Sequence, residues 1–508
     1  MLMSADAFRE SLRAYKPRVF VNGERVACVA DEPRLAPGIA GVGVCYDFAL
    51  DPALAPVMTA RQGTTGKTVN RMLHIDETGA DLLAKLEAVR LVCRTSGCAQ
   101  RYLAHDSLNA LWQATKRSDA EHGSAYHARF LNYLHEVQDR DLTLGVAMTD
   151  AKGDRSQRPG EQANPDVYLR IVERRADGIV IRGTKAIVTG APYMHEFLVM
   201  PCRTHRPEDA DCAVCCAVPV DAEGVTIVAR PAGRPGDPAA KFSAKYGQSV
   251  GVVLFDDVFV PWERVFLAGE TEAAGFLTTS YATHHRHSCI GARAGFGDLL
   301  IGAGALMAEA NGLDPERHGH IREQLVELIK IVEGFYACGV AASVYGQRDP
   351  GGTMMPDTVF ANIGKLLLAT QIYEMHRIAH YVSGGLVVAL PGPEEDHNPE
   401  TAASLAAVLG GRADIPYAQR AEVARLLEDL TVSSQAGWYS VISLHGGGSP
   451  EAMKREIWRH YPVAEKTALV EELLGRGVLD QGQRASRQPG RCCASGCAAP
   501  ETVQPAAE

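Results

Sequence analysis

The chain has 508 residues, enough for about three domains of common size, which excludes a peptide or a small disulfide-stapled module. Apolar residues make up 46% and charged residues 22%, close to globular averages, which excludes a wholly disordered or collagen-like chain. The 51 basic and 61 acidic residues give a net charge of −10, which argues against a chain-wide basic surface for nucleic acid or anionic membrane.

The sequence also predicts the compartment. No apolar run approaches the ~20 residues that a membrane-spanning helix needs. Residues 1–25 mix acids and bases without the apolar centre of a secretory signal, so we expect a cytoplasmic protein without membrane contact. Thirteen cysteines, an odd number, favour reduced thiols over a disulfide framework. Cys212, Cys215 and Cys216 stand in a β-like run whose alternating faces separate them, which predicts buried packing residues.

Three patterns follow one another along the chain. Residues 81–137 carry apolar side chains at three- and four-residue spacing, which predicts helices. From about residue 141, short β-rich runs alternate with Gly, Pro and Asp, which predicts a compact β domain. From about residue 276, long helical patterns return. The expected strands are 167–173, 178–188, 197–201, 212–220, 224–229 and 250–260, and the expected later helices are 291–310, 322–345, 359–382, 399–409 and 418–434.

This order predicts an α+β fold and excludes an alternating βαβ sheet. We expect a helical N-terminal domain over residues 1–140 and a central β-barrel-like domain over 141–275. A helical bundle over 276–475 and a disordered tail over 476–508 would follow. Within the β domain, Asp177-Gly178 predicts a hairpin whose two-residue turn needs positive φ at its centre.

A polar turn is the first candidate binding segment. No glycine-rich phosphate motif occurs in a convincing context, so nucleotide phosphates would have to be held in another way. Residues 150–156 offer backbone N–H groups, the Arg155 guanidinium and the Ser156 hydroxyl to an anion. Taken alone, such a charged turn is more often a solvated surface loop.

Two further segments could take part in chemistry. His284, His285 and His287 open a helical pattern, and one of them could act as a general acid or base. Exposed histidines at a helix start are the alternative. In residues 445–450, three glycines precede Ser-Pro, so backbone could approach a ligand before a helix begins near Glu451. The N-terminus of that helix would favour an anion.

Together these segments resemble the flavoprotein superfamily of 4-hydroxyphenylacetate 3-hydroxylase and 4-hydroxybutyryl-CoA dehydratase. The resemblance runs from Ser4 to about Leu474. It implies an acyl-CoA-dehydrogenase-like fold, FAD in a cleft between the β domain and the bundle, and a homotetramer whose FAD contacts cross subunits. The segments that carry it are residues 5–12, 21–25, 150–156, 188–191, 255–261, 383–385 and 445–450.

The resemblance also implies roles for single residues. It places His285 as the acid or base and Gln100 in the lining of the pocket. It places Thr189 near the flavin ring, and it favours a binding role over a surface loop for the polar turn. The residues expected to hold FAD are Thr149, Lys152, Asp154, Arg155, Ser156, Thr189, Gly384, Gly385, His445, Gly447 and Ser449.

The dehydratase branch is the more similar one, and it carries a four-iron cluster on three cysteines and one histidine. Cys98 and His285 match two of these ligand positions, whereas Tyr102 and Ala292 stand at the other two. Alanine cannot ligate iron, and a phenolate is a poor substitute for a thiolate. We therefore expect no iron-sulfur cluster and assign no metal ligand.

Other positions of that branch are changed as well. The tyrosine and lysine expected beside the third cysteine are Cys289 and Arg293, and an expected acidic residue corresponds to Ile442. The resemblance therefore favours a flavin-only monooxygenase that uses O2, and FADH2 from a separate reductase, on a small or carrier-bound substrate. One alternative is a divergent 4-hydroxybutyryl-CoA dehydratase or vinylacetyl-CoA isomerase with His285 as base. Another is a catalytically inactive flavin-binding subunit.

Overall fold

The computed structural model describes residues 2–98 and 100–476. Its α-helices are α1 (Ala5–Ser11), α2 (Ala36–Leu50), α3 (Ala55–Met58), α4 (Gly79–Ser96), α5 (Tyr102–His122), α6 (Tyr126–Asp139), α7 (Thr271–Ala310), α8 (Gly319–Val344), α9 (Thr358–Ser383), α10 (Leu386–Ala389), α11 (Ala402–Val408), α12 (Tyr417–Thr431), α13 (Ser434–His445), α14 (Pro450–His460) and α15 (Val463–Leu473). Its strands are β1 (Arg18–Val21), β2 (Glu24–Arg25), β3 (Thr59–Arg61), β4 (Thr68–Asn70), β5 (Leu144–Ala147), β6 (Arg170–Arg174), β7 (Gly178–Thr189), β8 (Glu196–Val199), β9 (Val214–Pro219), β10 (Val225–Ala229), β11 (Val250–Pro261), β12 (Val265–Ala268), β13 (Gln347–Arg348) and β14 (Met354–Met355).

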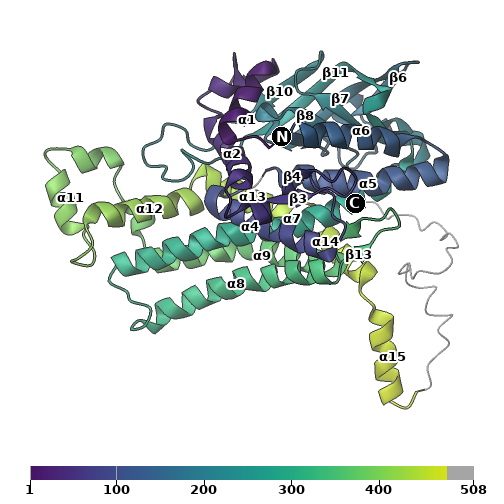
Figure 1. The fold of residues 1–508 in the computed structure, drawn as a ribbon. Helices are drawn as coiled ribbons and strands as arrows, with labels where there is room; N and C mark the ends of the chain where they lie inside the picture. Colours follow the sequence, from purple (N-terminus) through teal and green to yellow (C-terminus); the bar gives the residue numbers. More distant parts are fainter. Residues whose placement is uncertain (1, 99, 477–508) are drawn as a thin grey trace.

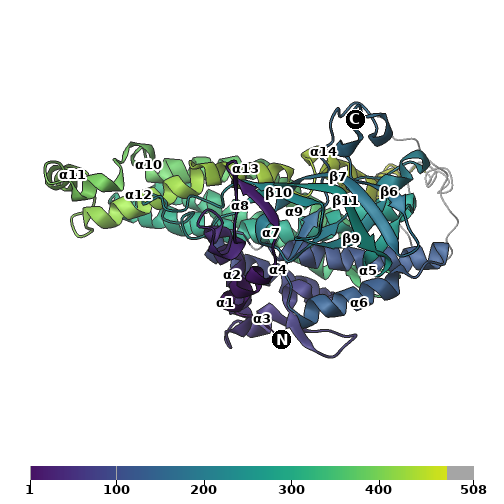
Figure 2. The same ribbon diagram turned by 90° about the horizontal axis from the view of Figure 1, so that it is seen from above.

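The β domain lies against a bundle of long helices. Figure 1 shows β6, β7, β10 and β11 above the long helices α7, α8 and α9. Seen from above, the bundle extends well beyond the strands toward α11 and α12 (Figure 2). The candidate site described below lies where residues next to the strands meet α7, α9 and α13.

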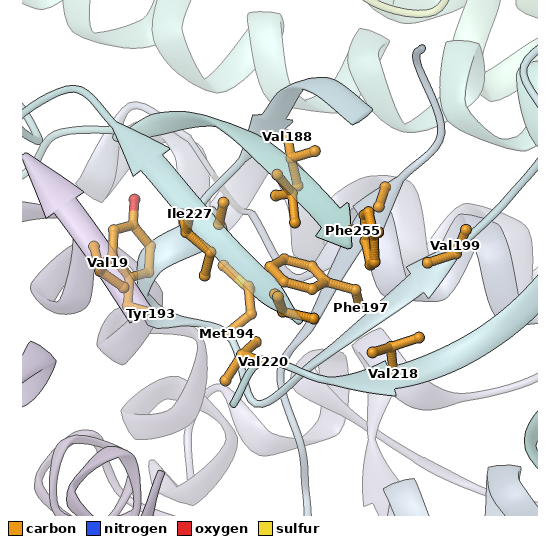
Figure 3. Close-up of a cluster of buried hydrophobic side chains, with 14 of the residues drawn as sticks. Val19, Val188, Tyr193, Met194, Phe197, Val199, Val218, Val220, Ile227 and Phe255 are labelled. Carbon is orange, nitrogen blue, oxygen red and sulfur yellow. The ribbon is translucent and has the colours of Figure 1, made fainter. Parts of the chain in front are cut away.

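The core of the β domain is formed by two sheets. The six-stranded sheet has the order β2-β1-β10-β11-β7-β6, and the four-stranded sheet has the order β12-β9-β8-β5. Inward-facing apolar side chains of both sheets meet in one buried cluster, because strand residues alternate between faces. Figure 3 shows part of this cluster, with Ile227 and Phe255 from the larger sheet beside Phe197 and Val218 from the smaller one.

The first 140 residues are not wholly helical, contrary to the expectation from sequence. Strand β1 pairs in parallel with β10, with Val19 opposite Ile227, and β2 pairs with β1. The N-terminal segment is therefore part of the central sheet. Strand β1 is short and its partner is distant in the sequence, so local periodicity could not reveal the pairing.

The expected hairpin at Asp177-Gly178 is present, but its turn differs from the expected one. Strands β6 and β7 pair antiparallel, and the Arg175 amide donates to the Gly178 carbonyl at 2.8 Å. Neither Asp177 nor Gly178 has positive φ. The two residues between Arg175 and Gly178, Ala176 and Asp177, therefore turn the chain without the positive φ that the dipeptide predicted.

Helix α7 is the central element of the bundle. It has 40 residues and packs against α4, α5, α8 and α9. Two glycines allow its close approach to α4, because a Cβ at Gly291 would lie 2.6 Å from the Leu86 carbonyl oxygen. A Cβ at Gly295 would lie 2.5 Å from the Arg90 carbonyl oxygen. Glycine at both positions therefore lets the backbones of α7 and α4 come together.

Helix α7 also differs from expectation in length and apolar character. The sequence predicted a helix from residue 291, whereas α7 begins at Thr271. By length and composition it could span a membrane, since an 18-residue window has a mean hydropathy of 1.3. Because 67% of that window is buried inside the protein, the helix has the character of a core helix. The expected tail lies, from residue 477 onward, outside the described residues.

Candidate functional site

One face of α7 carries a row of four chemically active side chains. Tyr281, His285, Cys289 and Arg293 follow one another at four-residue intervals, which places them on one helical face. All four are buried. Because α7 begins at Thr271, well before the histidines, the alternative of exposed histidines at a helix start is wrong.

The imidazole of His285 lies between a carboxylate and a thiol. Its Nδ1 atom is 3.1 Å from Oδ2 of Asp106, and its Nε2 atom is 3.6 Å from Sγ of Cys289. The rings of Tyr281 and Tyr102 stack on it, with centroids 5.3 and 5.7 Å away. These contacts fix the orientation of the ring, so that each nitrogen faces a group that can exchange a proton with it.

Asp106 is held by a buried polar network on its other side. Its Oδ1 atom accepts a hydrogen bond from Ser288 at 2.6 Å and lies 3.6 Å from the Lys85 ammonium. Lys85 in turn donates to Ser288 at 2.9 Å. Although burial alone raises the pKa of Asp106, the charge of Lys85 and the hydrogen bonds from histidines lower it well below its usual range. These contacts favour the anionic form of Asp106 beside His285.

The glycine loop after α13 lies against His285. Gly447 has a φ of +77°, and a Cβ there would lie 3.2 Å from the His285 ring. Its carbonyl accepts a hydrogen bond from Arg286 at 2.8 Å. As expected, a helix follows the loop, and Ser449 caps the N-terminus of α14. The structure thus joins the histidine stretch and the glycine loop, whereas the side chains of His445 and Ser449 are exposed.

Lys365 and Arg293 approach the same position from α9 and α7. The Lys365 ammonium donates to the Ser443 carbonyl, and Arg293 donates to the Ser443 hydroxyl at 2.5 Å. Burial lowers the pKa of Lys365 to about 8, although nearby Cys289 opposes this change. Two basic groups therefore lie beside the thiol near the end of α13.

The predicted pocket residue Gln100 lies where the β domain meets these helices. Its amide nitrogen donates to the Tyr193 hydroxyl at 3.2 Å, and that hydroxyl also accepts from the Ser249 amide at 3.0 Å. Its Oε1 atom is 2.5 Å from where a Cβ on Gly190 would stand. Gln100 therefore lies at the turn directly after Thr189, and the structure brings these two predicted residues together.

Several buried polar atoms near this interface have no partner among the residues that the structure describes. They include Oε1 of Gln100, Nη1 of Arg293 and Nε1 of Trp438. The Arg293 guanidinium lies 6.0 Å from the Trp438 ring, which also lines a small hollow together with Gln248. Buried polar atoms in proteins are normally paired. The orphaned atoms of Gln100 and Trp438 offer an acceptor and a donor, which fits a flat heterocycle such as the flavin ring with its nitrogens and carbonyls.

The polar turn of residues 150–156 begins beside strand β7. The Ala186 amide donates to the Thr149 carbonyl at 2.8 Å. Because a strand advances about 3.3 Å per residue, Ala186 is about 10 Å from Thr189 at the end of the same strand. The turn and Thr189 therefore lie along one strand, as contacts with a single extended ligand require.

Within the turn, part of the expected anion-binding capacity is already used. Asp154 accepts hydrogen bonds from the Ser156 amide and from the Ser156 hydroxyl. Arg155 is exposed, and Lys152 has a left-handed backbone with a φ of +73°. Of the two side-chain donors that the sequence suggested, the Ser156 hydroxyl already donates to Asp154, and the Arg155 guanidinium is exposed.

Gly384 and Gly385 are not brought to His285 within one chain. They follow the last residue of α9, Ser383, whereas Lys365 near the other end of that helix lies beside the thiol. At 1.5 Å per residue, Lys365 and Ser383 are about 27 Å apart. The exposed glycines at the far end of α9 are therefore separate from the residues around His285.

The side chains at the implied cluster positions do not fit an iron-sulfur cluster. Cys98, Tyr102 and Ala292 pack together in one apolar cluster, and the Tyr102 ring stacks on His285. In the part of the chain that the structure describes, no group of three or more His, Cys, Asp or Glu side chains could hold a metal. A phenol ring and a methyl group thus stand where two thiolates would be needed.

Sequence reasoning assigned no role to several residues of this site. A signal for some of them was present, because Tyr102 and Asp106, like the row on α7, are four residues apart. Lys85 and Lys365 had no such signal, since their helices meet α7 only in the folded chain. The residues without an assigned role were Lys85, Asp106, Ser288, Cys289, Arg293 and Lys365.

Two models of one protein family cover nearly the whole chain. Residues 4–267 match the model described as 4-hydroxyphenylacetate 3-hydroxylase N terminal, and residues 274–475 match the corresponding C-terminal model. The chain belongs to the 4-hydroxyphenylacetate 3-hydroxylase family. The predicted resemblance is therefore confirmed.

Relatives of this family member include proteins of the dehydratase branch. It is 35% identical to the 4-hydroxybutyryl-CoA dehydratase/vinylacetyl-CoA-Delta-isomerase of Clostridium aminobutyricum, over 94% of this chain and 100% of the relative. A solved structure of an oxygen-tolerant archaeal 4-hydroxybutyryl-CoA dehydratase from N. maritimus matches with a TM-score of 0.90 and 35% identity, covering 94% and 97% of the two chains.

The hydroxylase branch shows the same fold. A structure of the oxygenase component of 4-hydroxyphenylacetate 3-monooxygenase, complexed with FAD, matches with a TM-score of 0.83 and 22% identity. The match covers 93% of this chain and 98% of the other. The predicted fold class, α+β with an acyl-CoA-dehydrogenase-like arrangement, is confirmed for this family member.

Proposed function

We propose that this protein binds FAD between the β domain and the helical bundle and is a flavin-only oxidoreductase. The favoured reaction is that of a monooxygenase, in which O2, and FADH2 from a separate reductase, oxidise a small or carrier-bound substrate. One observation carries this proposal: Tyr102 and Ala292 fill two cluster positions, while the neighbouring cleft retains polar atoms that fit a flavin.

The residues at the cleft would bind and orient the flavin and its substrate. Gln100 and Trp438 would offer the flavin buried polar atoms that have no partner among the described residues, and Arg293 would offer such an atom to the substrate. Thr189 would stand beside the ring, and the Gly447 loop would let backbone approach it. Bound there, FAD would supply electron transfer, and the protein would orient the reacting groups and exclude water.

His285 would handle the proton of the reaction. Burial lowers its pKa, but Cys289 and the anionic Asp106 outweigh burial and raise it, so the ring is ready to give a proton. Asp106 would hold Nδ1 in place and leave Nε2 as the exchanging atom. Once it has given up this proton, the same ring could instead withdraw a proton from a substrate.

That second use defines the alternative function, an isomerase or dehydratase acting on a CoA-linked acyl group. It is favoured by the 35% identity to a 4-hydroxybutyryl-CoA dehydratase/vinylacetyl-CoA-Delta-isomerase and by the buried His285–Asp106 pair. Moving a double bond needs a base and a stabilised enolate, and these do not by themselves need iron. Dehydration without a cluster is the less favoured reaction.

A homotetramer in the cytoplasm is part of the proposal. Because Gly384 and Gly385 lie about 27 Å along α9 from the thiol, we expect them to complete the flavin site of a neighbouring subunit. Native mass spectrometry of the FAD-loaded protein should show four chains. A monomer that binds FAD fully would contradict shared sites.

The deciding experiment is anaerobic purification with FAD, iron and acid-labile sulfide quantified per subunit. We expect about one FAD and no stoichiometric iron, whereas about four irons per subunit would overturn the proposal. Absence of flavin would favour a catalytically inactive subunit.

Thermal unfolding with added CoA thioesters then separates the two reactions. A ligand at 100 times its Kd stabilises the folded state by about 2.7 kcal/mol, so an enzyme that acts on CoA thioesters should unfold at a higher temperature when they are present. A monooxygenase of free phenols should show no such shift.

A further inference from the structure

Cys289 is a buried cysteine for which neither proposed reaction has a use. It is 8% exposed, and its Sγ atom lies 3.6 Å from Nε2 of His285. His285 in turn is fixed by Asp106 through Nδ1. A nucleophile beside a base, with the base oriented by a third group, is the arrangement of nucleophilic catalysis.

We propose that Cys289, His285 and Asp106 form a nucleophilic triad that adds to small α,β-unsaturated carbonyl compounds. Its placement beside FAD rests on the proposed function, whereas the reactivity of the thiol does not. The addition would occur whether the protein is an oxygenase or an isomerase.

The surroundings of the thiol favour its ionised form. Burial alone raises the pKa of the Cys289 thiol, but the charge and hydrogen bond of His285 outweigh it and lower that pKa. Lys365 and Arg293 act in the same direction. Burial raises the pKa of the three neutral groups that face the thiol, which are Cys98, Tyr102 and Tyr281.

Two other buried cysteines, on strand β9, lack this environment. Cys215 and Cys216 lie on opposite faces of strand β9, in two apolar clusters of the protein, as the sequence predicted. Burial raises the pKa of both thiols. They are packing residues, and their contrast with Cys289 comes from the imidazole and the cations around that thiol.

The chemical class of the substrate follows from Arg293. Its Nε atom donates to Ser443, while its buried Nη1 atom has no partner among the described residues. It follows Cys289 by about one helical turn on the same face. A carbonyl oxygen bound to Nη1 would place a conjugated carbon near the sulfur, and the thiolate is the nucleophilic form of cysteine.

The step balances without an oxidant or a leaving group. The thiol proton passes to Nε2 of His285, and the sulfur forms a bond to the β-carbon. The electron pair of the double bond moves toward the carbonyl oxygen held by Arg293. His285 then returns its proton to the α-carbon, while Asp106 keeps Nδ1 oriented.

The test measures alkylation of the intact, FAD-loaded protein by acrylamide, followed by peptide mass spectrometry of each cysteine. Cys338 on α8 is the internal reference, because it is more exposed and its thiol contacts the Gly334 carbonyl at 3.6 Å. We expect Cys289 to react at least about tenfold faster than Cys338, since the thiolate is the reacting form. An equal or lower rate in the wild-type protein overturns the proposal by itself.

Two variants separate the roles of the base and the acceptor site. His285→Asn should slow the alkylation of Cys289 about tenfold and leave the alkylation rate of Cys338 unchanged. Arg293→Gln should slow the reaction with acrylamide more than that with iodomethane, which has no oxygen to bind. Cys338→Ser is the matched control and should leave the Cys289 rate unchanged. Equal alkylation rates of Cys289 in the folded His285 variant and in the wild type would overturn the triad. The FAD and iron contents of the same samples test the proposed function separately.

Discussion

Nδ1 of His285 lies 3.1 Å from Oδ2 of Asp106, and this contact joins α7 to α5 in the interior of the protein. Asp106 is fully buried and also faces Lys85 and His105, so three other titratable groups depend on one carboxylate. Removing one member of such a buried set leaves another charge uncompensated, which makes the contact testable through stability.

Asp106→Asn should lower the free energy of unfolding by about 3–5 kcal/mol near neutral pH, because Lys85 loses its buried counter-charge. Burial lowers the pKa of His285, while Cys289 and Asp106 raise it to about 9. The stability from this raised pKa is present below the unfolded value of about 6.5 and is lost as pH rises through the folded value. The deficit of the variant, measured by chemical denaturation, should therefore be larger at about pH 6 than at about pH 10.

The matched control is Asp211→Asn, which removes an exposed partner of Arg174. Exposed pairs are worth at most about 1 kcal/mol, so this variant should lose much less stability. A similar loss in both variants, or a deficit of Asp106→Asn that does not change with pH, would count against the buried network.

Tyr102→Cys combined with Ala292→Cys should restore iron binding. Together with Cys98 and His285, the double variant would supply the three thiolates and one imidazole of the dehydratase branch. After anaerobic reconstitution, we expect iron and sulfide near about four per subunit, with a broad visible absorption. The matched control, Tyr102→Phe, should remain free of iron. Iron in the control, or none in the folded double variant, would refute this account of the missing ligands.

Gly447→Ala should weaken FAD binding, because its Cβ would lie 3.2 Å from the His285 ring in the proposed flavin cleft. Gly312→Ala is the matched control, since Gly312 has a φ of +76° against +77° for Gly447 but no atom within 4 Å of the added Cβ. Both variants should lose about 1–2 kcal/mol of stability from left-handed strain. We expect a loss of FAD affinity of about tenfold, equal to about 1.4 kcal/mol, in the Gly447 variant alone. Equal affinities by fluorescence titration would place the flavin elsewhere.

Acid should destabilise the protein in part through His195. Its Nδ1 atom accepts from the Thr143 amide at 2.9 Å, and burial, followed by the charges of Arg101 and Arg140, lowers its pKa to about 3. The unfolded chain therefore takes up this proton first, near about pH 6.5, so stability should fall as pH drops from there toward about 3.

In the His195→Gln variant, the slope of the unfolding free energy against pH should be smaller by up to the contribution of one proton, which is about 1.4 kcal/mol per pH unit. Denaturation curves between about pH 6 and about pH 4 measure the slope. Replacing the exposed His122 by Gln should leave it unchanged. If the His195 variant keeps the full wild-type slope, the buried neutral imidazole is not a source of acid lability.

Local signals were sufficient for most secondary structure. The expected strand 178–188 is β7, and the expected strand 250–260 is β11, because both runs combine β-branched residues with flanking turns. The helix expected near Glu451 begins at Pro450, since Ser-Pro carries both a cap and a favoured first-turn residue. Strand β1 was missed because its four residues carry little periodic signal.

The amino-acid sequence by itself determined the α+β class and the order of helices, sheet and bundle, and it predicted that Tyr102 and Ala292 stand at two cluster positions. These properties depend on residue type and on neighbours close in the chain. Only the tertiary structure decided that His285 lies between Asp106 and Cys289, and that Gly447 lies against its ring. The physical reason is that α5, α7 and the glycine loop are far apart in sequence, and packing of a long central helix is what brings their side chains together.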